Sequence, residues 1–199
     1  MSPMAQRTAR DRILDTAYEL FSRSGIRAVG VDTVVAESGV AKMTLYRHFP
    51  SKENLVLAFM VDRENRWTRG WVEEETARRA KTPAERLLAI FDIFDEWFHE
   101  DDFEGCSFIN VLLETCDRNS PIRAAAIAHL ANIRAFVRSQ AEEIGVRDPD
   151  DFSRQWHILM KGSIVAAGEG DQDAARRAKE VARLLLAHER PARRRRASN

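Results

Sequence analysis

The sequence predicts an all-α fold of about nine helices, and three observations lead to this prediction. Only 9 Gly and 6 Pro occur among 199 residues, whereas 31% of the residues are charged, and this balance favours helices with solvated faces over strands and turns. Apolar residues recur every three or four positions in most segments. Capping residues, Pro and Gly separate these segments. With 44% hydrophobic residues, the helices can bury a core.

The first fifty residues predict three short helices. The apolar stripe of the first, residues 6–24, consists of Ile13, Ala17, Leu20 and Phe21. Gly25 follows this segment as a helix stop. A second helix is expected at 31–38, ending at Gly39, and a third at 42–48. We expect residues 1–50 to form a compact domain of these three short helices.

Later residues predict six further helices in a second domain, residues 51–189. The expected ranges are 52–80, 83–100, 107–117, 121–144, 149–170 and 173–188. Ser51 is a good N-cap for the first of them, and Pro83 suits a first helical position. Gly145 ends the expected helix at 121–144. The stretch "RPARRRR" belongs to a final segment, 190–199, which we expect to be a disordered basic tail.

The segment "AESGVAKMTLYRHFPSKENL", residues 36–55, carries the strongest functional signal. Two short helices joined by a tight turn make a helix-turn-helix, and Gly39 can take the left-handed conformation that the turn needs. Val40, Leu45 and Phe49 would then face inward. The other side presents polar and basic groups that can meet phosphate oxygens and base edges: Lys42, Met43, Tyr46 and Arg47, with Thr44 and His48 at the edges. Lys52 begins the next helix, a natural phosphate site.

The same stretch, "GVAKMTLYRHFPSKENLV", closely resembles the recognition-helix segment of the TetR family of transcriptional regulators. The preceding "ILDTAYELFSRSGIRAVGVDTVVAESG" resembles the first two helices of that family, so the resemblance covers about residues 8–57. It implies a DNA-binding N-terminal domain, and a C-terminal domain that binds a small-molecule effector and forms a homodimer. Repression relieved by the effector is the usual action of such proteins.

The resemblance implies that the groove-facing positions are Ala41, Lys42, Met43 and Thr44, and that Tyr46, His48 and Lys52 contact phosphate. The full set of DNA-binding candidates is Thr33, Ala41, Lys42, Met43, Thr44, Tyr46, Arg47, His48 and Lys52. Two positions depart from the family pattern. Gly30 stands where a Ser or Thr cap is common, and Val35 stands where a small Ala is common, but neither removes a donor from the DNA face.

The last two helices predict a homodimer. Residues 149–170 carry two apolar stripes on nearly opposite faces, and a helix apolar on two faces needs two burial partners. One stripe holds Phe152, Trp156, Leu159, Met160, Ser163, Ile164 and Ala167, and the other holds Ile158, Gly162, Val165 and Ala166. The family resemblance also implies a four-helix dimer interface here. The candidate interface residues are Trp156, Met160, Ile164, Val181, Leu184 and Leu185.

Bulky rings crowd three helices of the second domain and suggest a mostly apolar effector pocket. The candidates are Trp67, Trp71, Phe91, Phe94, Trp97, Phe98, Phe108, Asn110 and Glu114. For any single ring, a place in the hydrophobic core is the better interpretation, and only the rings taken together favour a pocket. The stretch "GCSFINVLLE" resembles a segment of one subtype of the family's C-terminal domains, which implies a place beside the pocket. We expect a hydrophobic or aromatic effector.

Other functions have weaker support in the sequence. Asp92, Asp95 and Glu96 could be a catalytic acid–base group, but they lie opposite the aromatic stripe, where a solvated acidic face is expected. His99, Cys106, Glu114 and Cys116 match no strong zinc spacing. No nucleotide-binding or nucleophile motif occurs. We therefore expect neither an enzyme nor a bound cofactor or metal.

The remaining features concern location and an alternative function. Two cysteines make no disulfide framework, and no apolar run has the length of a signal peptide core or a membrane span, so we expect a soluble cytoplasmic protein without a membrane partner. Arg190 to Arg196 could touch phosphate, although a basic tail far from the helix-turn-helix is poorly placed for specific readout. The alternative function is an architectural DNA-binding protein that needs no effector.

Overall fold

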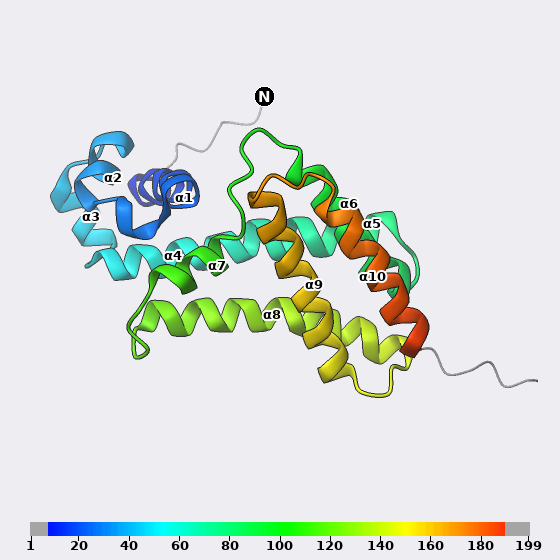
Figure 1. Ribbon diagram of the computed structural model, residues 1–199. Helices are drawn as coiled ribbons and strands as arrows, with labels where there is room; N and C mark the ends of the chain where they lie inside the picture. Colours follow the sequence, from blue (N-terminus) through cyan, green and yellow to red (C-terminus); the bar gives the residue numbers. More distant parts are fainter. Residues whose placement is uncertain (1–7, 190–199) are drawn as a thin grey trace, which may run out of the picture. The chain divides into compact units, whose positions relative to one another are not determined.

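The computed structural model describes residues 8–189, and within them all regular structure is helical, as the sequence predicts. The elements are α1 (Ala9–Ala28), α2 (Val31–Ser38), α3 (Lys42–His48), α4 (Lys52–Arg63), η1 (Glu64–Glu73), α5 (Glu74–Arg79), α6 (Pro83–Phe98), α7 (Ser107–Glu114), α8 (Pro121–Ile144), α9 (Pro149–Gly168) and α10 (Ala174–Glu189) (Figure 1). Because α4, η1 and α5 follow one another without a gap, the described chain contains nine helical rods. The basic tail that the sequence predicts lies outside the described residues.

The helices group into two compact units. Unit 1 contains the chain up to Gly70 together with Glu104–Ala131, and unit 2 contains Trp71–Phe103 and the chain from Asn132 onward. This grouping differs from the division at residue 50 that the sequence suggests. The reason is that α4 and α7 both pack on α1, so the helix-turn-helix shares a core with two helices of the second expected domain. The functional division at residue 50 stays a prediction.

Local capping chemistry explains where several helices begin. Ser51 accepts a hydrogen bond from the Asn54 N–H at 3.1 Å, as an N-cap should. Thr82 forms a capping box with Glu85, and Pro83 is the first residue of α6. A second capping box, between Thr8 and Asp11, begins α1. The cap at Ser51 and the helix start at Pro83 agree with expectation, whereas the Thr8 box was not expected, although Thr8 and Asp11 have the required spacing.

The fourth rod departs from the uniform α-helix expected over 52–80. Its middle third, η1, is a π-helix, in which hydrogen bonds join residues five apart. A Cβ at Gly70 would lie 2.8 Å from the carbonyl oxygen of Asn65, five residues earlier. Real side chains do not approach a backbone oxygen so closely, so Gly70 is what allows this wide turn to close.

Unit 1 is built around α1, which packs against α2, α3, α4 and α7. The apolar stripe predicted for the helix-turn-helix is buried as expected: Leu20, Phe21, Val34, Val40, Leu45 and Phe49 are all in the core. The α4 residue Phe59 is fully buried beneath α1. Its ring meets Tyr18 and Phe21 edge-to-face, with centroids 5.7 and 5.5 Å away. These rings hold the three short helices on α4.

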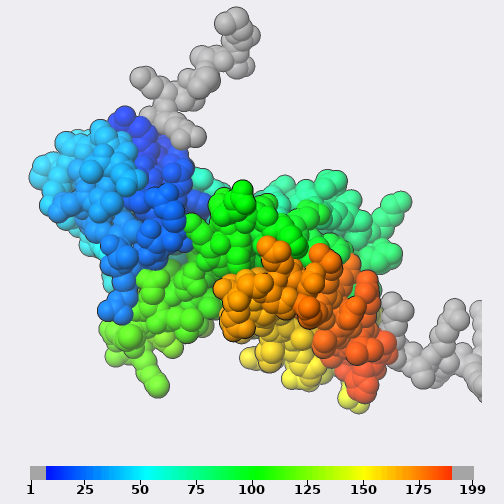
Figure 2. Space-filling view, turned by 45° about the horizontal axis from the view of Figure 1, so that its top comes forward, coloured from blue at the N-terminus to red at the C-terminus, as the bar shows by residue number. Residues whose placement is uncertain are grey.

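Unit 2 is built around α6, which packs against α5, α9 and α10. α9 and α10 also pack on each other and lie side by side in orange and red in Figures 1 and 2. Phe91 of α6 and Trp156 of α9 are buried together, with ring centroids 5.5 Å apart. Within residues 8–189, no helix combines the length and the apolar character required to cross a membrane.

A buried histidine of unit 2 makes the fold sensitive to acid. His157 on α9 is 2% exposed, and burial lowers its pKa to about 3, with Lys161 and Arg134 adding smaller repulsion. The unfolded chain therefore binds a proton below its ordinary pKa of about 6.5 that the folded chain does not bind. Because the unfolded state binds more protons in this range, stability falls as the pH falls from about 6.5 toward 3.

When the pH falls from 7.5 to 5.0, we expect protonation of His157 in the unfolded state to lower the free energy of unfolding by about 2 kcal/mol. His157→Leu replaces the ring by an apolar side chain that cannot take up a proton. Urea unfolding of both proteins at the two pH values measures the difference. The variant should lose about 2 kcal/mol less than the parent protein, and an equal loss in both would contradict the assignment.

Candidate nucleic-acid interface

The turn between α2 and α3 has the geometry that a helix-turn-helix requires. Gly39 takes the left-handed conformation, with φ 65° and ψ 27°, as the sequence predicts. The chain then re-enters a helix at Lys42, so that α3 starts three residues after the turn. Leu45 is fully buried and anchors the inner face of α3 on α1 and α2. The outer face of α3 is fixed by this anchor.

The outer face of α3 is exposed. Met43 is 79% exposed. Lys42, Tyr46 and Arg47 are also exposed, whereas Thr44 and His48 are half-buried. Residues of α2 and α3 form the pale-blue surface of Figure 2. The candidates Thr33 on α2 and Ala41 before α3 are exposed as well.

Lys52 lies apart from this face, at the first position of α4, and is half-buried. Desolvation lowers its pKa, and the negative charge of Glu114 opposes that effect. A lysine at the N-terminus of a twelve-residue helix adds its charge to free backbone N–H groups. The position therefore has the chemistry of a phosphate contact.

Glu114, a candidate for the effector pocket, contacts α1 of unit 1. Its carboxylate accepts a hydrogen bond from the Arg27 N–H at 2.8 Å. Arg27 follows the break in α1 at Gly25, whose φ of 77° and ψ of 163° are essentially confined to glycine. The structure thus gives Glu114 a contact with α1, and its assignment to the effector pocket stays a prediction.

Gly25 also leaves room for this carboxylate. A Cβ at Gly25 would lie 2.5 Å from Oε1 of Glu114. We expect Gly25→Ala to reduce the unfolding free energy by about 2–4 kcal/mol, through backbone strain and loss of the hydrogen bond to Arg27. Urea unfolding measures the loss.

Gly145→Ala is the matched control for this substitution. Gly145 has a φ of 81°, but its added Cβ would meet nothing within 4 Å, so only the backbone cost of about 1–2 kcal/mol remains. In a Glu114→Ala background, Gly25→Ala should become less costly. The account is wrong if Gly25→Ala costs no more than Gly145→Ala.

The aromatic residues proposed for an effector pocket fall into both units. In unit 2, Phe91, Phe94, Trp97 and Phe98 are buried on α6. Their rings pack on one another, and Trp97 also meets Trp71 with centroids 6.4 Å apart and Phe103 at 4.9 Å. This continuous ring-to-ring packing is what a hydrophobic core requires.

The candidates in unit 1 have polar neighbours. Phe108 of α7 stacks on the His129 ring of α8, with centroids 5.0 Å apart, and His129 pairs with the buried carboxylate of Glu64. Trp67 is buried one turn beyond Glu64, and the half-buried Asn110 donates a hydrogen bond to the Glu104 carbonyl oxygen. Sequence analysis missed Glu64 and His129. They lie 65 residues apart, so no local pattern joins them.

The dimer candidates divide into buried and exposed residues. Trp156, Met160 and Ile164 are buried in the core of unit 2, so they are not available to a second chain and their assignment to the interface is wrong. Val181 and Leu184 are exposed, Leu184 by 72%, and Leu185 is half-buried. The second stripe of α9, with Ile158 and Val165, is exposed too. Of the two stripes in the sequence, the first faces the core.

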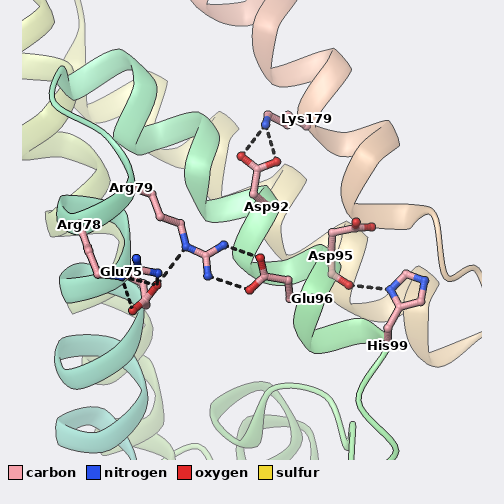
Figure 3. A network of polar contacts seen from close by, with 8 residues as sticks. All are labelled: Glu75, Arg78, Arg79, Asp92, Asp95, Glu96, His99 and Lys179. Carbon is pink, nitrogen blue, oxygen red and sulfur yellow. Dashed lines mark hydrogen bonds and ion pairs between the residues drawn. The ribbon is translucent and has the colours of Figure 1, made fainter.

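The acidic residues considered for catalysis are held in ion pairs, and Figure 3 shows those of Asp92 and Glu96. Arg79 of α5 donates both Nη atoms to Glu96 of α6, at 2.6 and 2.7 Å, and this pairing lowers the pKa of Glu96. Asp92 and Asp95 of α6 pair with Lys179 and Arg176 of α10. The three carboxylates thus join α6 to its neighbours.

The zinc alternative also lacks a cluster in the described structure. The His99 ring contacts the Asp95 main-chain carbonyl oxygen at 2.7 Å, and Cys106 is buried whereas Cys116 is exposed. No group of three or more His, Cys, Asp or Glu side chains within residues 8–189 is arranged to hold a metal ion.

Two family models match the chain. One, described as bacterial regulatory proteins of the tetR family, matches residues 13–59. The other, described as a tetracyclin repressor-like C-terminal domain, matches residues 83–182. The first covers the helices that form the candidate interface, and the second covers α6 to most of α10.

Individual relatives agree with these models. An uncharacterised HTH-type transcriptional regulator of Mycobacterium tuberculosis is 40% identical over 167 residues, which are 81% of this chain and 77% of that protein. The HTH-type transcriptional regulator QacR of Staphylococcus aureus is 36% identical over 78 residues, 39% of this chain but only 40% of QacR. The crystal structure of a TetR-family transcriptional regulator from Streptomyces coelicolor superposes with a TM-score of 0.83 at 27% identity, covering 92% of this chain and 96% of that one.

Proposed function

Because the chain belongs to the TetR family of bacterial transcriptional regulators, we propose that it is a repressor with a palindromic operator and a small effector. On this proposal a homodimer binds the operator through α3, and a hydrophobic or aromatic effector releases it. The single observation that carries the DNA-binding part is the exposed face of α3, where Lys42, Met43 and Tyr46 stand on a helix anchored by a buried Leu45.

Selection of bound fragments from genomic DNA tests the operator part. A two-fold symmetric dimer places its two recognition helices in successive major grooves, so we expect a palindrome whose half-sites are about 10 base pairs apart or a multiple of that. Neighbouring genes in the selected fragments would indicate the class of effector. Recovery of fragments without any shared sequence would contradict an operator-specific regulator.

The effector part rests on family membership and on aromatic groups beside polar ones. Phe108, His129 and Glu64 of unit 1 offer a ring surface and a hydrogen-bonded polar pair within one group, which would orient a ligand that carries a polar substituent. The rod formed by α4, η1 and α5 begins at Lys52, so a shift of this rod would move a phosphate contact. A difference of about 1–3 kcal/mol in effector binding between two states changes operator affinity about 5- to 150-fold.

A thermal-shift screen of apolar metabolites and drugs, followed by operator binding with each hit, tests the coupling. Hits that stabilise the protein and weaken operator binding support the proposal. If hits stabilise the protein but none changes operator affinity, the coupling fails and the architectural alternative, which needs no effector, gains support.

The proposed dimer surface comprises the exposed apolar residues Ile158, Val165, Val181 and Leu184 on the adjacent helices α9 and α10. Leu184→Glu would place a charge in this surface, and we expect it to destabilise the dimer by at least about 2 kcal/mol, because an unpaired buried charge is costly. Sedimentation across a concentration series measures the change. Leu113→Glu is the control, since Leu113 is equally exposed but lies on α7. Equal effects of both variants, or none from Leu184→Glu, would place the interface elsewhere.

A further inference from the structure

An acidic residue faces the DNA-binding side of α3. Asp32 lies in the first turn of α2, and its carboxylate is 2.7 Å from Nζ of Lys42, the first residue of α3. Both side chains are exposed, Asp32 by 80% and Lys42 by 54%. The hydrogen bond and the negative charge of Asp32 raise the pKa of Lys42. A residue proposed to contact DNA is therefore already paired with a carboxylate on the neighbouring helix.

Stability gives little reason for this pair. Ion pairs between exposed side chains contribute little to folding, because water screens the attraction and holding two long side chains in one geometry costs entropy. Asp32 also places a negative charge in the first turn of α2, where the preceding Gly30 supplies no side-chain cap, and at an exposed site this favourable interaction with the helix N-terminus is small. When DNA binds, in contrast, the phosphates repel a nearby carboxylate, so Asp32 lowers the affinity for DNA.

The direction in which Lys42 points decides what it contacts. A lysine ammonium is a point charge on a flexible stem, and it binds any phosphate within reach. Phosphate contacts position a protein but carry no sequence information. The N-terminal residues of a recognition helix contact base edges, where guanine offers the acceptors O6 and N7. A lysine held near the start of the helix can reach such acceptors while being kept from the phosphates.

We propose that Asp32 is a specificity-determining residue that acts through Lys42. Its carboxylate holds the ammonium at the start of α3, which weakens binding to DNA of any sequence and reserves the lysine for base acceptors in the operator. Asp32 thereby increases the preference for the operator over other DNA, because it weakens binding to the other sequences. The inference rests on the proposed placement of α3 in the major groove, and it adds a residue of α2 that makes no DNA contact of its own.

Asp32→Asn removes the charge and keeps the shape. The probes are a duplex selected by the parent protein from genomic DNA and a scrambled duplex of the same length, each titrated over a range of salt concentrations. Released from Asp32, Lys42 becomes a phosphate contact. We expect affinity for the scrambled duplex to rise about 3- to 10-fold, with the salt slope steeper by about one, and the ratio of selected to scrambled affinity to fall by a similar factor.

Glu37→Gln is the matched control, since Glu37 is an exposed acid on the same helix and forms no ion pair with another residue of the described range 8–189. It removes the same charge without releasing Lys42, so it should leave the affinity ratio unchanged. In a Lys42→Ala background, Asp32→Asn should also leave the ratio unchanged. Thermal melting confirms that each variant is folded.

Three results would overturn the inference. Asp32→Asn and Glu37→Gln could change both affinities equally, which would indicate a general charge effect. Asp32→Asn could lower the ratio even without Lys42, or it could change nothing. If Lys42→Ala weakens operator binding in any of these cases, only the role of Asp32 fails. If Lys42→Ala has no effect on either duplex, the placement of α3 fails with it.

Discussion

Replacement of Lys42, Thr44, Tyr46 and His48 by alanine is expected to weaken binding to the selected operator by at least about 100-fold. A good base contact contributes about 1–3 kcal/mol, phosphate contacts add to the affinity for any sequence, and the variant removes four side chains from one helix face. All four are exposed or half-buried, so the fold should survive. Fluorescence anisotropy with a labelled duplex measures the affinity, and circular dichroism checks the helix content.

Arg23→Ala is the control for this experiment. Arg23 is an exposed cation on α1 outside the candidate set, so its loss should change affinity by no more than about 3-fold, the effect of one distant charge. Unchanged operator affinity in the folded quadruple variant would show that α3 is not the DNA-binding element.

Phe59→Ala is expected to reduce the unfolding free energy by about 3–5 kcal/mol, the range for deleting a fully buried aromatic side chain. The ring is completely buried, and Tyr18 and Phe21 of α1 pack edge-to-face on it. Its removal leaves a cavity between α4 and α1, so the helix-turn-helix should pack less tightly on α4. Urea unfolding, followed by circular dichroism, measures the loss.

Phe59→Leu separates the cost of the cavity from the cost of losing the edge-to-face ring contacts. Leucine fills much of the same volume, so its cost should be smaller, about 1–2 kcal/mol. If Phe59→Ala costs less than about 1 kcal/mol, Phe59 does not have the role assigned to it here.

The helix-turn-helix could be read from the sequence because its signals are local. Gly39 marks the turn, Ser51 caps the next helix, and α3 spans Lys42–His48 as expected. These features depend on residues within a few positions of one another. Leu45 and Phe49 lie four residues apart, which places both on the buried face without knowledge of any other helix.

The contact between Glu114 and the break in α1 could not be read in this way. Its partners are 87 residues apart in sequence, and Glu114 ends a segment whose composition suggested a pocket. The π-helix η1 depends on a close approach of Gly70 to the Asn65 carbonyl oxygen, which apolar periodicity does not report. On α9, both stripes are apolar, so only the packing shows that Trp156 faces the core and Ile158 the surface.

The central claim is that two copies of α3 read base edges in the major groove of one operator. Methylation interference on the selected duplex tests this most directly, because methylation of guanine N7 blocks an acceptor that lies in the major groove. The account predicts that methylation prevents binding at two symmetric clusters whose centres are about 10 base pairs apart, or a multiple of that spacing. Binding that is indifferent to guanine N7 methylation, or sensitive at one cluster alone, would contradict it.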